Sequence, residues 1–172
     1  QKSLKGDADA VYVRTLTYRA EDFVPVMACP SQVDKIRDVS TLEGIPIDQV
    51  FIGSCTNGRL EDLAAAAEVL KGQKVADYVK LIVTPASRKI YKQAMDLGIM
   101  ETLAEAGAII THPGCGLCCG RTGGILSDGE RVVATNNRNF LGRMGTSKVE
   151  IFLASPRTAA ACAVAGKIVT PK

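Results

Sequence analysis

The stretch THPGCGLCCG, residues 111–120, places three of the chain's six cysteines within five positions. Proline and glycine surround these residues, Cys115, Cys118 and Cys119. Thiolates are ligands of zinc and of iron–sulfur clusters, and closely spaced cysteines also form disulfides or redox pairs. The choice among these chemistries depends on the other cysteines, at positions 29, 55 and 162, and on the elements that bring them near.

Three of these chemistries fit the spacing poorly. The chain shows no charged-then-apolar leader, and cytosolic reductants keep thiols reduced, so disulfides are disfavoured. A structural zinc site usually needs two pairs of ligands; Cys115 and Cys118 form one pair, and the single histidine, His112, has no matching partner. A thioredoxin-like site needs a helix at the C-x-x-C pair, which the glycines after Cys119 disfavour.

A cubane iron–sulfur cluster suits the remaining combination of cysteines. Thiolates from two loops, Cys55 and the pair Cys115 and Cys118, would hold three irons and leave the fourth open as a Lewis acid. A zinc or redox C-x-x-C interaction module, with partners supplied by another chain, remains the alternative. The other candidates have plainer interpretations: Cys119 packs or lies behind the cluster, Cys29 and Cys162 are small buried apolar residues, and His112 is a strand-end residue.

The elements that would position these residues follow an α/β pattern. Short β-branched runs predict strands, and alanine-rich stretches with glycine stops predict helices between them. We therefore expect an α/β fold with a mainly parallel sheet flanked by helices in three layers, α/β/α. The predicted strands are 50–53, 81–84, 108–111, 131–135 and 149–153, and the predicted helices are 60–71, 87–97, 101–106 and 158–164.

The predicted domain occupies residues 49–172, and residues 1–48 are predicted to be a lead-in or linker segment with one plausible strand over 11–18. Within the domain, the segments 54–58, 113–120 and 136–143 each follow a predicted strand. The carboxyl ends of parallel strands meet at one edge of a sheet, where ligands bind in open α/β folds. We therefore expect the cysteines of the first two segments to lie beside the third.

The third segment, NNRNFLGR, is suited to bind anions. Arg138 and Arg143 carry planar guanidinium groups that match carboxylates bidentately, and asparagines precede and separate them. On composition alone, a solvated loop with surface ion pairs is the simpler interpretation. The position at the mouth of the sheet favours a substrate with more than one carboxylate.

Composition narrows the function classes. The chain has 172 residues, of which 47% are hydrophobic, enough for one substantial core. Its net charge of +3 is spread along the chain, so we expect no nucleic-acid partner. No apolar stretch reaches the roughly 18 residues that cross a bilayer, so we expect no membrane partner and a cytoplasmic protein. The first residue is Gln1, which suggests a processed product or a piece of a longer chain.

Five segments together resemble the aconitase superfamily. They are FIGSCTNGRLEDL (51–63), PGCGLCCG (113–120), NNRNFLGRMG (136–145), ASPRTAAACAVAGKI (154–168) and the lead-in MACPSQVDKIRDV (27–39). The segments resemble most closely the large subunits of 3-isopropylmalate dehydratase and homoaconitase, of which this chain matches the C-terminal part.

The resemblance implies a hydro-lyase that isomerises a hydroxy-polycarboxylic acid by dehydration and rehydration. Cys55, Cys115 and Cys118 match the three ligands of a four-iron, four-sulfur cluster with one open iron, a cluster that is readily lost in air. Arg138, Arg143 and Asn137 match substrate-binding residues. Ser54 and Asn57 match residues that shape the cysteine loop behind the ligands.

The resemblance also implies missing parts. Complete large subunits carry preceding domains with histidine and acidic catalytic residues, and a small swivelling subunit supplies the serine base. We therefore expect no catalytic residue in this chain, no activity of the chain alone, and both of these parts as partners. The GRLEDL form and the short ending after Lys167 favour the isopropylmalate or homoaconitate group over aconitase proper. Within that group we expect conversion of 2-isopropylmalate to 3-isopropylmalate, in leucine biosynthesis, and the alternative is the homoaconitase reaction of the lysine or coenzyme B pathways.

Overall fold

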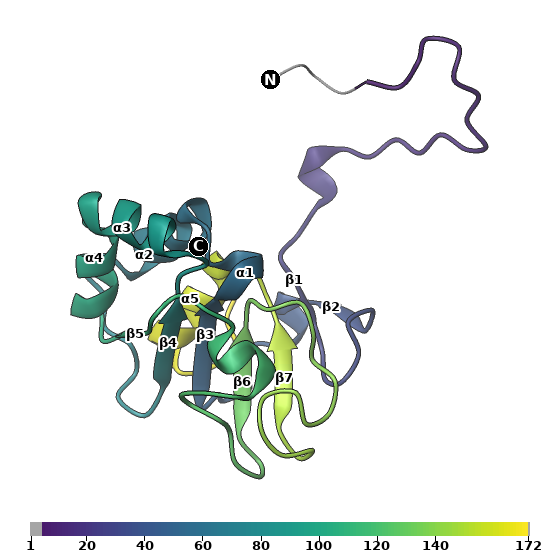
Figure 1. The fold of residues 1–172 in the computed structure, drawn as a ribbon. Coiled ribbons are helices and arrows are strands. Elements are labelled where there is room, and N and C mark those ends of the chain that lie inside the picture. The colour runs from purple at the N-terminus through teal and green to yellow at the C-terminus, as the bar shows by residue number, and fades with distance from the viewer. Residues whose placement is uncertain (1–4, 172) are drawn as a thin grey trace.

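The computed structural model describes residues 5–171, so the first four residues of the predicted lead-in segment lie outside it. Seven strands form one sheet in the order β2-β1-β7-β6-β3-β4-β5. Strands β7, β6, β3, β4 and β5 are parallel to their neighbours in that series (Figure 1). Their bounds are Glu150–Leu153, Arg131–Ala134, Gln49–Gly53, Lys80–Thr84 and Ile109–Ile110. The predicted mainly parallel α/β sheet and its five strands are confirmed.

The helices also follow the sequence pattern. The four longer ones are α2 (Leu60–Leu70), α3 (Arg88–Asp96), α4 (Ile99–Glu105) and α5 (Pro156–Ala165). Ser155 caps α5, where its hydroxyl accepts a hydrogen bond from the N–H of Thr158, and Pro156 takes the first helical position. Gly166 ends that helix with a left-handed backbone. Short helical turns complete the set: α1 (Ser54–Asn57), η1 (Ala20–Asp22), η2 (Val39–Thr41) and η3 (Gly116–Cys119).

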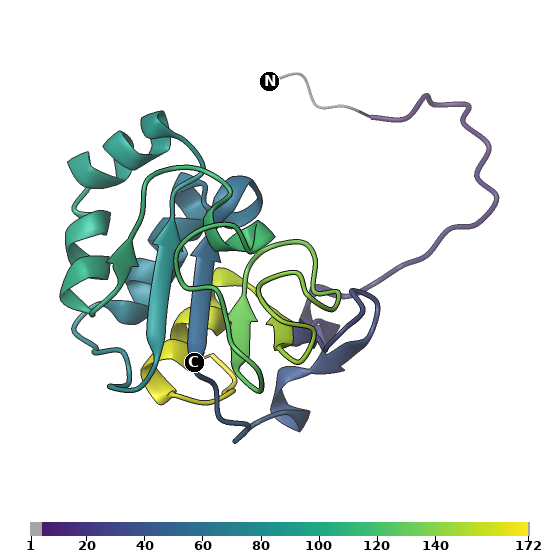
Figure 2. The same cartoon turned by 60° about the horizontal axis from the view of Figure 1, so that its bottom comes forward.

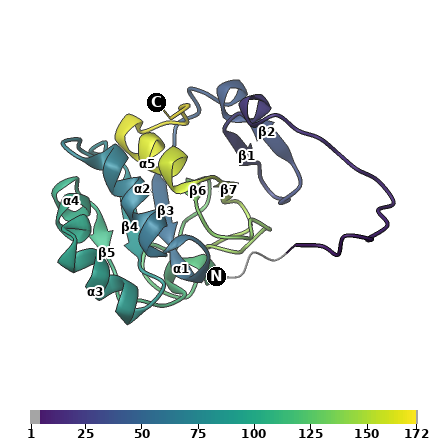
Figure 3. The ribbon, with the colours of Figure 1, turned by 90° about the horizontal axis from the view of Figure 1, so that it is seen from above.

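The two faces of the sheet are covered differently, as the alternation along β3 shows. Val50 and Ile52 belong to the larger core, which contains residues of α2, α4 and α5 (Figure 3). Phe51 belongs to a smaller core with Leu117 of η3 and Met144. Long helices therefore cover one face, and loop segments that carry η3 cover the other.

Chain direction explains this division. The connections from β3 to β4 and from β4 to β5 move one way across the sheet, whereas those from β5 to β6 and from β6 to β7 move back. Crossovers between parallel strands are right-handed, so a reversal of direction transfers the connection to the opposite face. The cysteine-bearing η3 and the arginine loop that follows β6 thus lie on the face without the long helices (Figure 2).

The predicted lead-in segment contributes to the same sheet. Strands β1 (Val26–Ala28) and β2 (Ile36–Asp38) form an antiparallel hairpin, and Ala28 pairs with Leu153 of β7. Before this hairpin, residues 5–25 run away from the domain with exposed side chains (Figure 1). The strand predicted over 11–18 is not formed there, because no described strand pairs with it and an isolated strand leaves its backbone to solvent.

None of the helices described in residues 5–171 is long and apolar enough to cross a bilayer.

Candidate functional site

The strand order reverses between β3 and β6, and this is where the site residues gather. After β3 the chain continues to β4, which lies on one side of β3, and after β6 it continues to β7, which lies on the opposite side. At such a switch point, the loops after the two strands diverge and open a crevice at their carboxyl ends. Cys55 follows β3, and the segment from Thr135 to Arg143 follows β6.

Cys55 is carried by the single helical turn α1. Gly53 precedes this turn with φ 134°, and a Cβ added there would lie 2.0 Å from the carbonyl oxygen of Thr84. Glycine is therefore required for β3 and β4 to end this close together. Ser54 follows with φ 64°, a left-handed conformation that costs a non-glycine residue energy and that is often found at functional sites. The turn holds the Cys55 side chain exposed.

Cys115 and Cys118 lie on the 3-10 turn that includes η3. The N–H of Cys118 donates to the carbonyl of Cys115 at 3.0 Å, and the N–H of Gly120 donates to that of Leu117 at 2.8 Å. Cys115 is exposed and Cys118 is buried. Cys119 is half-buried, and its thiol contacts the carbonyl of Gly116 at 3.7 Å, in accordance with a packing role.

Two buried threonines, which the sequence analysis did not single out, tie the loops together. The hydroxyl of Thr135 accepts a hydrogen bond from the N–H of Gly53 at 2.9 Å, and the carbonyl of Thr135 accepts one from the Asn57 amide. Thr84, at the end of β4, shares a 2.6 Å hydrogen bond with Thr111 after β5. The available signal for both was a threonine directly after a run of three apolar residues, 81–83 and 132–134.

The three predicted ligands therefore lie on loops at one edge of the sheet. Among residues 5–171, however, no group of three or more His, Cys, Asp or Glu side chains is close enough to hold a single metal ion. A four-iron cluster needs a different arrangement of ligands, because each thiolate binds its own iron and the ligands stand further apart than around one ion.

The predicted carboxylate-binding residues differ in exposure and in hydrogen bonding. Arg138 is exposed, and its guanidinium donates to the carbonyl of the preceding Asn137 at 2.7 Å. Arg143 is half-buried and turns toward the cysteine turn, where its Nε donates to the carbonyl of Cys118 at 2.6 Å. Asn137 is exposed beside Arg138.

The neighbouring asparagines are buried, which sequence reasoning did not anticipate. The amide of Asn139 donates to the carbonyl of Cys29 at 2.8 Å and so fastens the β1–β2 hairpin to the arginine loop. A cavity of about 270 Å³ between that hairpin and this loop is lined by residues 31–34 and 138–140. The lead-in segment therefore forms one wall beside Arg138.

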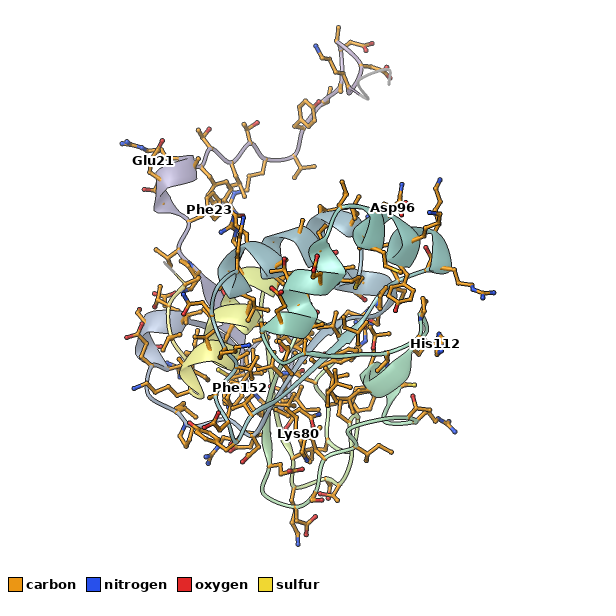
Figure 4. All side chains as sticks on the ribbon, turned by 90° about the vertical axis from the view of Figure 1, so that its left-hand side faces the viewer. Glu21, Phe23, Lys80, Asp96, His112 and Phe152 are labelled. Carbon is orange, nitrogen blue, oxygen red and sulfur yellow. The ribbon has the colours of Figure 1, made fainter. Side chains whose placement is uncertain are left out.

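A second cavity, of about 550 Å³, lies beside η3. Its lining includes Cys115, His112 and Arg121, whereas Cys55, Arg138 and Arg143 do not line it. His112 is exposed near η3 (Figure 4). This cavity is therefore not the place where all the predicted ligands and arginines meet.

The remaining cysteines are buried, as predicted. Cys29 is 6% exposed and Cys162 is 0% exposed. Burial raises the pKa of Cys162 to about 11, so its thiol stays protonated at neutral pH. Neither side chain is placed to bind a ligand at the carboxyl edge.

The structure is thus a mostly parallel α/β domain that carries cysteines and arginines on loops at the carboxyl ends of its strands. Residues 27–166 match the aconitase family (aconitate hydratase). The chain belongs to this family.

Individual relatives agree with this assignment. The chain is 50% identical over 171 residues to "3-isopropylmalate dehydratase large subunit 2" of Archaeoglobus fulgidus, covering 99% of the chain and 41% of the relative. It is 53% identical over 171 residues to "3-isopropylmalate dehydratase large subunit 1" of Methanopyrus kandleri, with the same coverage of both. It is 52% identical over 166 residues to the "Homoaconitase large subunit" of Thermus thermophilus, covering 96% and 40%. The chain thus spans about two fifths of the length of these relatives.

Proposed function

We propose that this chain is the cluster-bearing part of a cytoplasmic hydro-lyase large subunit that converts 2-isopropylmalate to 3-isopropylmalate. The observation that carries the proposal is that Arg143, in the loop after β6, contacts Cys118 in the turn after β5, while Cys55 follows β3 at the same carboxyl edge of the sheet. Relatives named as 3-isopropylmalate dehydratase large subunits support the substrate, and their names imply a small-subunit partner.

The residues at this edge fit a four-iron, four-sulfur cluster. The hydroxyl of Ser54, beside Cys55, is wholly buried and has no hydrogen-bond partner among residues 5–171. A buried hydroxyl without a partner costs about 1–3 kcal/mol, so an acceptor such as a cluster sulfur would satisfy it. The groups available to bind iron are thiols, of which those of Cys55 and Cys115 are exposed and that of Cys118 is buried. Cys55, Cys115 and Cys118 would hold three irons.

When bound, such a cluster supplies a Lewis acid that makes the substrate hydroxyl a better leaving group. The chain's own residues bind and orient the substrate. Arg138 is exposed at the edge and offers a bidentate site for a carboxylate, and Asn137 lies next to it. Asn57 holds the cysteine loop, since its amide donates to the carbonyl of Thr135, and Ser54 shapes the loop through its left-handed backbone.

Cluster binding is tested by anaerobic reconstitution of residues 1–172 with iron and sulfide. We expect broad visible absorption, with iron and sulfide bound in near-equal amounts. The triple variant Cys55→Ser, Cys115→Ser, Cys118→Ser should lose both, whereas the matched control Cys29→Ser, Cys162→Ser should keep both. Absorption that survives in the triple variant would contradict the ligand assignment.

The substrate is tested with a longer polypeptide that supplies the rest of the large subunit, mixed with its small subunit. We expect turnover of 2-isopropylmalate to exceed that of homocitrate or citrate. Preferential turnover of homocitrate would instead assign the homoaconitase reaction, which the Thermus thermophilus relative supports.

A further inference from the structure

The guanidinium of Arg143 contacts both Cys118 of the cysteine turn and the ring of Phe140. Its Nε donates to the carbonyl of Cys118 at 2.6 Å, and one terminal nitrogen lies 3.7 Å from the sulfur of the same residue. Its Cζ lies 5.4 Å from the ring centroid of Phe140. These contacts fix the plane of the guanidinium against Cys118 rather than leaving it free in solvent.

The backbone of Arg143 packs against the same turn. Gly120 ends the turn with φ 62°, and a Cβ added there would lie 2.8 Å from the carbonyl oxygen of Arg143. The arginine loop and the cysteine turn therefore meet through both main chain and side chain. Hydrogen bonds from a charged donor are about twice as strong as neutral ones, so the side chain contributes substantially to this junction.

Arg138, five positions earlier in the same loop, provides the contrast. Its only hydrogen bond among the described residues joins it to the carbonyl of its neighbour Asn137, and its side chain is exposed. Two arginines of one loop thus have different environments: Arg138 faces solvent, and Arg143 holds the segment that carries two predicted cluster ligands.

We propose that Arg143 is a positioning residue that fixes the turn from Cys115 to Gly120 and orients the Cys118 thiolate for cluster binding. The part of this inference that concerns the cluster rests on the proposed function. Arginine has five N–H donors, so the contacts with Cys118 leave others available to a substrate carboxylate. Hydrogen bonds to ligand sulfurs also influence the reduction potential of a cluster, so loss of Arg143 should lower that potential.

The test compares Arg143→Lys with Arg138→Lys in the chain of residues 1–172. Lysine keeps the charge but lacks the planar fork that spans the carbonyl and the sulfur. Without a cluster, we expect amide hydrogen exchange at Cys118 and Gly120, whose N–H groups close the turn, to become about tenfold faster in Arg143→Lys. In Arg138→Lys, exchange at these amides should equal that of the wild type.

After anaerobic reconstitution, a chelator should remove the cluster several-fold faster from Arg143→Lys than from Arg138→Lys or the wild type. If Arg143→Lys fails to fold, as judged by circular dichroism, Phe140→Leu carries the test. It removes the ring beside the guanidinium, and we expect exchange at the same two amides to be about two- to threefold faster.

Unchanged exchange at Cys118 and Gly120 in Arg143→Lys would overturn the positioning role, whether or not the wild-type chain binds a cluster. Faster exchange in that variant supports the role. If the wild-type chain then binds no iron or sulfide, the proposed function fails while the turn-fixing role stands.

Discussion

Thr135, directly after β6, accepts hydrogen bonds from both ends of the turn that carries Cys55. Its hydroxyl accepts from Gly53 before the Cys55 turn, and its carbonyl accepts from Asn57 at the end of that turn. The side chain is wholly buried, so water cannot replace a lost acceptor. A single hydroxyl thus couples the end of β3 to the end of β6.

Thr135→Val should remove this acceptor and lower the free energy of unfolding by about 1–3 kcal/mol, because the N–H of Gly53 is left buried and unpaired. Chemical denaturation of the variant and the wild type measures the difference. The control Thr122→Val changes an exposed threonine and should stay within about 0.5 kcal/mol of the wild type. Equal stabilities of Thr135→Val and wild type would contradict the coupling.

Cys162 predicts a dependence of stability on pH. Burial raises the pKa of its thiol to about 11, from an ordinary value of 9.0. Between these two values the unfolded chain has released the proton and the folded chain retains it, so the free energy of unfolding falls as pH rises. Below pH 9 the thiol is protonated in both states, so it contributes no pH dependence to the free energy of unfolding.

We expect this loss to approach about 1.4 kcal/mol per pH unit within that window. The measurement is denaturant unfolding from pH 8 to 11 in the wild type and in Cys162→Ala. The difference between the two unfolding free energies should change with pH above 9 and stay constant below it. A constant difference over the whole range would exclude Cys162 as the source.

At the scale of elements, short turns rather than long helices present the site. Cys55 lies on the one-turn helix α1 and Cys118 on the 3-10 turn η3, and both turns follow parallel strands. The long helices α2 and α5 pack on the opposite face and supply the core that supports β3. Rigid strands and helices thereby fix the start of each loop, while the glycines allow the turns that expose thiols.

Helix α5 supplies a test of this support. Ser155→Ala removes the hydroxyl that accepts from the N–H of Thr158 and should lower the free energy of unfolding by about 1 kcal/mol. Thermal and urea unfolding measure the effect. Ser147→Ala, at an exposed loop position, is the matched control and should change stability by less than about 0.5 kcal/mol. A cost no larger than that of the control would contradict the capping role.

At the scale of the whole molecule, we expect catalysis to need more than this chain. The chain spans about two fifths of the length of relatives such as that of Archaeoglobus fulgidus, whose name specifies a large subunit. The sequence contains one histidine, and the resemblance implies that the catalytic bases lie on other domains and on a small subunit. We therefore expect binding of a cluster and completion of the reaction to be separable properties.

We expect reconstituted residues 1–172 alone to give no detectable turnover of 2-isopropylmalate, measured by chromatography of substrate and product. Addition of the remaining large-subunit region and the small subunit should produce turnover, because the resemblance implies that these parts supply the acid and base groups. Turnover by the chain alone at a rate similar to that of the assembled enzyme would refute this division of labour.

The sequence by itself determined the elements and the family. Periodicity, the Ser155–Pro156 cap and the Gly166 stop are local signals, and they predicted β3 through β7 and α2 through α5 with end points shifted by one or two residues. The spacing of cysteines and arginines supported the resemblance that the match over residues 27–166 confirmed. The predicted strand over 11–18 failed because a strand needs a pairing partner, which local sequence does not supply.

Only the tertiary structure decided which residues hold the site together. The roles of Thr84, Thr135 and Asn139 depend on contacts between segments distant in sequence, such as the one that joins Asn139 to Cys29. The two arginines look equivalent in NNRNFLGR, yet packing of that loop against η3 gives Arg143 the Cys118 carbonyl and leaves Arg138 to solvent. Local patterns specify what each segment can form, whereas the reversal of strand order specifies which segments meet.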